Sequence, residues 1–185
     1  MPLSNRMRDR NRIEAMVGRV TLEAFLRNQP CDEPPVCLRA ETLTRLLHRV
    51  EELSRFASST AAHDVRFSTQ VDPSLVFMVH RPSLFRSMMI LVENAFDAVL
   101  HGGGGRVAVD AKAVFGEVCI TITDDGAGLP DAWRDALRSR ALLPATGGLS
   151  KVVDLADRMD GTLRLVRTGP SGTSLALDLP NGAFV

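Results

Sequence analysis

Two carboxylates followed by alternating glycines stand at residues 120–130, in the stretch ITITDDGAGLP. Asp124 ends an apolar segment that alternates like a strand, and a strand end would hold its carboxylate in place to accept a hydrogen bond. Gly126 and Gly128 have no Cβ, so the backbone there can approach a flat ligand closely. The same residues also fit an ordinary strand that ends in an Asp-Gly turn.

Polar residues also interrupt the apolar, helix-like stretch ILVENAFDAVLHGGGG at residues 90–105. Stepping by three and four residues places Asn94 and Asp97 on one face of this helix, and Glu93 lies beside them. Such a face is either a binding site or simply the solvated side of a helix. The glycines that follow are expected to end the helix and form a turn.

Two further glycine positions lie toward the C-terminus. Gly147 and Gly148 precede an apolar, helical run, and a helix that starts there would offer free backbone N–H groups to a phosphate. Gly172 and Thr173 lead into the last strand-like segment. Taken singly, each of these stretches is weak evidence for a site.

The hydrophobic pattern predicts the elements that would position these residues. Helices are expected over residues 8–28, 40–60, 83–100, 131–141 and 146–161, and strands over 65–71, 75–80, 106–114, 117–125, 162–168 and 173–180. Consecutive hairpins favour an α+β fold, a two-layer α/β sandwich whose mixed or mostly antiparallel sheet carries helices on one face. The chain is expected to divide into an N-terminal helical segment, residues 1–62, and a domain, residues 63–185.

Composition and charge exclude several classes of protein. Lys+Arg and Asp+Glu both number 22 in the 185 residues, a balance that argues against binding nucleic acid through the whole surface. No apolar run approaches the roughly 18–20 residues that cross a bilayer, and the basic start lacks a signal-peptide core. We therefore expect a cytoplasmic chain that does not itself insert into a membrane. Three cysteines argue against a disulfide framework, and Cys31 and Cys37 lack the second Cys/His pair of a zinc site.

Together and in this order, the four stretches resemble one family. Over roughly residues 65–180 the chain is similar to the GHKL, or Bergerat-fold, ATP-binding superfamily. That superfamily includes sensor histidine kinases, type II DNA topoisomerases, a heat-shock chaperone family and a mismatch-repair family. The phrase NAFDAVLHGGGGRVAV and the helix and strand before it are most like the catalytic domain of sensor histidine kinases.

The resemblance implies roles for the matching positions and implies ATP and Mg²⁺ as ligands. Asn94 matches the asparagine that binds the magnesium ion bridging the phosphates, a task that suits an amide oxygen. Asp124 matches the aspartate that accepts a hydrogen bond from the adenine amino group. The other positions that match nucleotide-binding residues are Asp97, Gly126, Gly128, Gly148, Leu149, Gly172 and Thr173.

The chain also departs from the family pattern. Ile90 stands four residues before Asn94, where the family usually has an acidic residue or asparagine, and it can neither accept a proton nor bind a metal. Glu93 is the one candidate for a catalytic carboxylate, but it is displaced by about 60° around the helix, which favours a surface or structural role. Thr146 stands where the second glycine box usually begins with glycine. No histidine lies in residues 8–28, so the usual phosphoacceptor is not found there.

The resemblance favours an ATP-binding catalytic module of a two-component-type histidine kinase. Such a module would bind Mg-ATP and transfer the γ-phosphate to a histidine supplied in trans or outside this chain. The expected partner is a response regulator or a histidine-containing phosphoacceptor protein. The N-terminal helices are expected either to form a homodimer or to cap the sheet. Two alternatives remain open: a degenerate domain that acts as a non-enzymatic binding or regulatory module, and a serine kinase of the anti-sigma-factor type.

Overall fold

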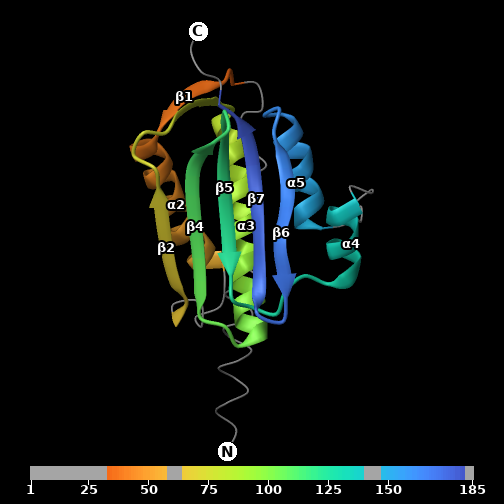
Figure 1. Ribbon diagram of the computed structural model, residues 1–185. Helices are drawn as coiled ribbons and strands as arrows, with labels where there is room; N and C mark the ends of the chain where they lie inside the picture. Colours follow the sequence, from red (N-terminus) through yellow and green to blue (C-terminus); the bar gives the residue numbers. More distant parts are fainter. Residues whose placement is uncertain (1–32, 58–63, 140–146, 182–185) are drawn as a thin grey trace, which may run out of the picture.

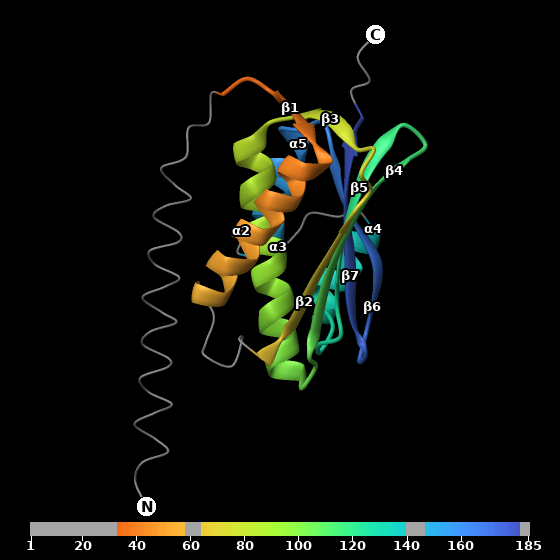
Figure 2. The same cartoon turned by 90° about the vertical axis from the view of Figure 1, so that its left-hand side faces the viewer.

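A five-stranded mixed sheet forms one layer of the protein, and helices cover one of its faces (Figures 1 and 2). The computed structural model describes residues 33–57, 64–139 and 147–181. β2 pairs in parallel with β4, and the other neighbouring strands are antiparallel. The predicted α+β sandwich with a mixed sheet is thus confirmed. The strand order is β2 (Arg66–Val71), β4 (Arg106–Val114), β5 (Glu117–Asp124), β7 (Gly172–Pro180) and β6 (Thr162–Gly169).

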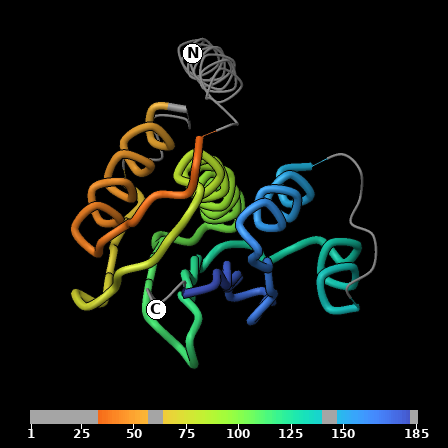
Figure 3. Tube along the Cα trace, turned by 90° about the horizontal axis from the view of Figure 1, so that it is seen from above, coloured from red at the N-terminus to blue at the C-terminus, as the bar shows by residue number. Residues whose placement is uncertain are grey.

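Three helices form the second layer: α2 (Ala40–Ala57), α3 (Arg81–Gly102) and α5 (Gly148–Asp157). Seen from above, α3 lies between the other two, and it contacts both of them (Figure 3). The short helix α4 (Asp131–Ser139) lies beyond the β6 edge of the sheet (Figures 1 and 3). Within the described residues, no helix is both long and apolar enough to cross a membrane.

Local sequence fixes both ends of the central helix α3. The His80 side chain caps its start by accepting a hydrogen bond from the backbone N–H of Ser83, and Pro82 supplies a backbone angle that suits the first turn. At the other end Gly103 takes the left-handed conformation, with φ 72°, and its N–H bonds back to the carbonyl of Val99. The glycine run therefore ends the helix as predicted.

The strand β3 (Val76–Val79) corrects the predicted pairing. We expected a hairpin between residues 65–71 and 75–80, but β3 pairs antiparallel with β1 (Val36–Arg39), a strand that was not predicted. Asp72 accepts hydrogen bonds from the backbone N–H and the hydroxyl of Ser74, and this turn leads the chain away from β2. β2 is then free to pair with β4 across the α3 connection.

The helix predicted over residues 40–60 caps the sheet. It ends at Ala57 within the described residues, and Leu43, Leu47 and Val50 are fully buried in the same core as α3. α2 thus packs on α3 and β2, as expected for a capping helix, and a homodimer through the N-terminal helices stays a prediction. The helix predicted over residues 8–28 lies outside the described residues.

The edge strand β6 contains an irregularity in its pairing with β7. The register shifts between Leu165 and Arg167, which leaves Val166 as an extra, half-exposed residue. A bulge of this kind bends the strand and increases its twist.

Phe96 is the test residue for the packing of α3. Its ring is fully buried, meets Phe67 edge-on at a centroid distance of 6.0 Å, and lies 5.4 Å from the guanidinium carbon of Arg55. Phe96→Ala is expected to lower the free energy of unfolding by about 3–5 kcal/mol, measured by urea unfolding. The matched control is Phe115→Ala, because Phe115 lies exposed at the β4–β5 turn, and it should change stability by about 0.5 kcal/mol or less. A loss below about 1 kcal/mol for Phe96→Ala would contradict this packing.

Candidate functional site

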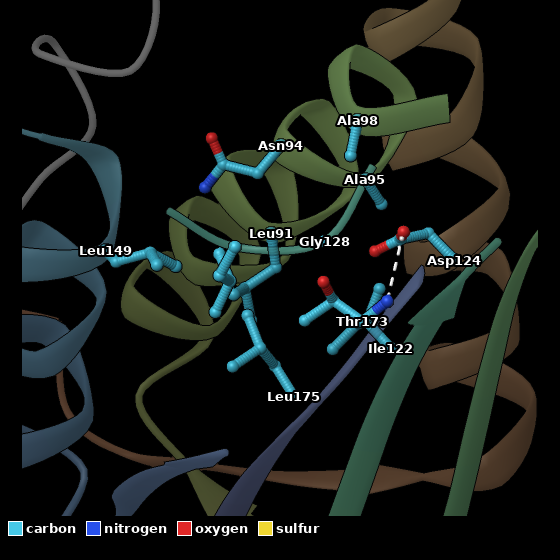
Figure 4. A pocket seen from close by; sticks show the side chains of 11 residues that line it. Leu91, Asn94, Ala95, Ala98, Ile122, Asp124, Gly128, Leu149, Thr173 and Leu175 are labelled. Atoms are coloured by element: carbon cyan, nitrogen blue, oxygen red, sulfur yellow. Dashed lines mark hydrogen bonds between the residues drawn. The ribbon is translucent and has the colours of Figure 1, made fainter. Parts of the chain in front are cut away.

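A pocket opens between the middle of α3 and the ends of β5 and β7 (Figure 4). Its cavity volume is about 30 Å³, which is room for about one or two water molecules. Most of its wall is apolar. The apolar side chains that line it beside Leu149 are Leu91, Ala95, Ala98, Ile122, Leu129 and Leu175.

Asp124 is the buried acid of this pocket, with 7% of its surface exposed. Its Oδ1 accepts two backbone hydrogen bonds, from Gly126 at 2.9 Å and from Thr173 at 3.2 Å. Among the described residues no donor bonds to Oδ2, so this oxygen remains for a ligand. Burial raises the pKa of the Asp124 carboxyl, although the two backbone donors act in the opposite direction.

Glycines bring the chain close to Asp124. Gly172 has φ 111°, and a Cβ there would overlap the backbone of Asp124 itself. A Cβ at Gly126 would overlap the backbone of Ala98 on α3, and one at Gly128 would overlap the carbonyl of Gly169. We expected Gly126 and Gly128 to leave room for a flat ligand. In the structure the space of each missing Cβ is instead filled by protein backbone, so these glycines let loops and helix approach one another.

The wall formed by α3 was not predicted from sequence. Side chains shrink along one stripe of the helix, from Leu91 through Ala95 and Ala98 to Gly102, and the loop after β5 lies against its small end. The backbone N–H of Ala127 donates to the carbonyl of Ala98 at 3.1 Å. The spacing of small residues on the helix was the available signal for this contact.

Asp125 has a different task from its neighbour. Its exposed carboxylate accepts hydrogen bonds from the backbone N–H groups of Gly105 and Arg106, both at 2.8 Å. These bonds, with that of Arg106 first, lower the pKa of Asp125. The carboxylate therefore ties the glycine turn after α3 to the end of β5, a role that sequence reasoning missed.

The start of α5 packs directly on α3. A Cβ at Gly148 would come within 2.8 Å of Ile90 Cγ2 and 3.4 Å of Asn94 Nδ2, so glycine allows this close approach. The N-cap residue Gly147 provides no side-chain cap, and the first backbone N–H groups of α5 are left for water or a ligand. Asn94 and Leu149 lie toward one end of the pocket, and Asp124 and Thr173 toward the other (Figure 4).

The structure brings most of the predicted site residues together. Five of them line the pocket: Asn94, Asp124, Gly128, Leu149 and Thr173. Gly126, Gly148 and Gly172 lie immediately behind it and set its shape. Glu93 and Asp97 are half-buried on α3 and do not line it. In the described part of the chain, no three His, Cys, Asp or Glu side chains gather into a metal site.

A larger groove lies elsewhere, between α2 and the start of α3. It has a volume of about 490 Å³, and Arg45, Arg49 and Arg81 lie on its walls. None of the predicted site residues lines it. The smaller pocket is the candidate site because the buried acid, the asparagine and the start of α5 meet there.

Comparisons with known proteins agree on one family. Residues 80–183 match the family described as "Histidine kinase-, DNA gyrase B-, and HSP90-like ATPase". Over 134 residues the chain is 33% identical to the sensor-type histidine kinase PrrB of Mycobacterium tuberculosis, and over 136 residues it is 25% identical to sporulation kinase B of Bacillus subtilis. These matches cover 65% and 71% of this chain but 29% and 32% of the relatives.

Solved structures give the same result. The ATP-binding domain of PrrB from Mycobacterium tuberculosis has a TM-score of 0.56 at 27% identity, with 82% of this chain and all of that domain covered. The catalytic domain of the histidine kinase ThkA has a TM-score of 0.63 at 16% identity, covering 80% and 98%. The mycobacterial sensor histidine kinase MprB has a TM-score of 0.59 at 23% identity, and the match covers 79% of this chain and 97% of that one. The last two support the fold, and together the comparisons confirm the predicted resemblance.

Asp124→Asn is expected to leave the ligand-free protein as stable as the parent, or more stable, at neutral pH. The amide oxygen keeps both backbone hydrogen bonds without a charge that burial penalises. The pKa of Asp124 in the folded protein lies above its ordinary value of 3.8, so the buried charge destabilises the parent above the folded pKa. As the pH falls through the folded pKa toward 3.8, the carboxylate is protonated and this destabilisation is lost. Urea unfolding at several pH values should show the advantage of the variant shrinking on acidification.

Asp125→Asn is the matched control, and its expected effect on stability at neutral pH has the opposite sign. The pKa of Asp125 is lowered in the folded state, so its carboxylate stabilises the protein above 3.8 and loses this effect as the pH falls through the folded pKa. This variant should be less stable than the parent at neutral pH, and its deficit should shrink in acid. If both variants shift stability in the same direction at neutral pH, the two different roles of these acids are wrong.

Proposed function

The chain belongs to the histidine kinase-, DNA gyrase B- and HSP90-like ATPase family, and we propose that it binds Mg-ATP in the pocket between α3, β5 and β7. We further propose that it is the catalytic module of a two-component histidine kinase, as its histidine kinase relatives suggest. The phosphoacceptor would be a histidine in trans or outside this chain. The chain spans less than a third of the length of the curated kinases that it matches, so the signal and the partner belong to the proposal.

The observation that carries this proposal is the second oxygen of Asp124. Two backbone N–H groups hold Oδ1, so the carboxylate has a fixed direction and presents Oδ2 to the pocket. An adenine amino group is a donor of the right kind for this acceptor, and the apolar side chains of Ile122 and Leu175 provide a surface for the flat ring. A cavity of about 30 Å³ admits the base only when lining side chains such as Leu129 move outward.

The other end of the pocket fits phosphates and a magnesium ion. Asn94 offers one neutral amide oxygen, and no cluster of acids surrounds it in the described residues. This donor set suits Mg²⁺, which usually binds one or two protein ligands and completes its shell with phosphate oxygens and water. The ion would neutralise negative charge on the phosphates. The free N–H groups at the start of α5 would orient the same phosphates.

Phosphoryl transfer needs positioned reactants more than a strong base. Ile90 packs against the start of α5 and offers no group to activate water. We therefore propose slow hydrolysis of ATP, together with transfer to a histidine that another protein or segment brings to the phosphate end. The lack of a reactive group at Ile90 also favours the second candidate function, a regulatory module that binds nucleotide or a partner without catalysis.

The first test is calorimetric titration of Mg-ATP into the parent chain and into Asp124→Asn. Loss of a hydrogen bond to a charged acceptor costs about 1.5–3 kcal/mol, so affinity should fall by about one to two decades in the variant. Asp110→Asn, which changes an acid outside the pocket, should bind like the parent. Asn94→Ala should weaken binding of Mg-ATP and spare adenosine, since Asn94 lies at the phosphate end. No binding in the folded parent would point to the regulatory module.

The second test is transfer of label from ATP labelled in its γ-phosphate. A purified histidine-containing phosphoacceptor protein should gain an acid-labile phosphate, and the Asp124→Asn variant should transfer it more slowly at limiting ATP. Acid-stable label on a serine-containing partner instead would favour the serine kinase alternative. Binding of ATP without any transfer to the histidine partner would favour the regulatory module.

A further inference from the structure

We propose that Trp133 is a positioning residue that holds the start of α5 at the phosphate end of the pocket. Trp133 does not line the pocket, so its effect would pass through Gly147 and Gly148. The inference rests on the proposed function, since it concerns where the phosphates of the same nucleotide bind. It predicts a specific defect, in which affinity for the phosphates falls and affinity for the base does not.

The first observation is the contact between Trp133 and the N-cap of α5. A Cβ built on Gly147 would overlap the indole atoms Cζ2 and Cη2 of Trp133. The six-membered ring therefore lies directly against the backbone of Gly147. An aromatic ring is rigid and has only two side-chain torsions, so it fixes this backbone position at a low cost in conformational entropy.

The second observation is that the next residue, Gly148, packs against α3 on the side opposite to Trp133. The missing Cβ of Gly148 points to Ile90 Cγ2 and to the Asn94 amide on α3. The two glycines thus place the start of α5 between an indole ring on one side and α3 on the other. The residue that would hold the metal, Asn94, is part of the second support. A shift of α5 would therefore change the distance between its free N–H groups and Asn94.

The third observation concerns helix α4, which carries Trp133. In α4 no residue is fully buried, and Trp133 and Leu137, one turn apart, are the side chains that pack against the core. The backbone N–H of Trp133 donates to the carbonyl of Pro130 at 3.0 Å, and Leu129 donates to Thr168 Oγ1 at 2.8 Å. The backbone from Leu129, in the pocket, to Trp133 is therefore fixed by one bond to β6 and one bond within the first turn of α4.

The experiment compares two ligands in matched variants. Trp133→Leu keeps an apolar side chain but loses the ring atoms that reach Gly147, Trp133→Phe keeps a smaller ring, and Leu137→Ala loosens α4 without touching Gly147. Calorimetric titration with adenosine and with Mg-ADP gives two affinities for each protein, and urea unfolding confirms that each is folded. Trp133→Leu should bind Mg-ADP about tenfold more weakly, which corresponds to about one charge-assisted hydrogen bond, and adenosine as the parent does. Trp133→Phe should lie between.

Each result separates the inference from the function on which it rests. Equal loss for both ligands in Trp133→Leu, or loss for neither, would overturn the positioning role while the nucleotide site stands. The same selective loss in Leu137→Ala would also overturn it, because general loosening of α4 would then be the cause. Failure of the folded parent to bind either ligand would overturn the proposed function and this inference together.

A spectroscopic readout is built into the chain, since Trp133 is its one tryptophan. Mg-ADP should change the intrinsic fluorescence of the parent because the phosphates engage the backbone that the indole contacts. Adenosine should change it much less. Equal changes with the two ligands would contradict the proposed coupling between the ring and the phosphate end.

Discussion

The site depends on one buried carboxylate oxygen, Oδ1 of Asp124, which accepts the backbone N–H groups of Gly126 and Thr173. These three residues belong to the end of β5, the loop after it and the start of β7. A single acceptor thus joins segments that are separated by almost fifty residues of chain. The same arrangement directs the other oxygen into the pocket. Burial of this carboxylate disfavours its charged form, and perturbed acids of this kind are found preferentially at functional sites.

Close backbone contact is the second constraint, and it explains why glycines and alanines surround the acid. Gly126 lies on the backbone of Ala98, Gly172 on that of Asp124, and Gly148 against Ile90. Each position would gain a clash from a single added methyl group. These glycines therefore serve mainly to let β5, β7, α5 and α3 pack closely together. The shape of the pocket follows from how closely those elements meet.

Sequence alone predicted the helices and strands around the site, because their hydrophobic patterns are long and their ends carry strong signals such as the glycine run after α3. It also predicted Asn94 and Asp124 as site residues. It missed β1, a short strand beside prolines, because pairing with β3 is a tertiary event. It missed the role of Asp125 and the contact between Trp133 and Gly147 for the same reason. Their partners, Gly105 and Gly147, lie in other segments of the chain, so no local period in the sequence encodes these contacts.

The bulge in β6 and the neighbouring helix α4 affect how the edge of the sheet can pair with other molecules. An edge strand with a regular row of free backbone groups is a template on which a second sheet can grow. At the β6 edge the bulge at Val166 breaks that row, and α4 packs beside the strand. The β6 edge of the sheet is thus poorly suited to pairing with a strand of another molecule.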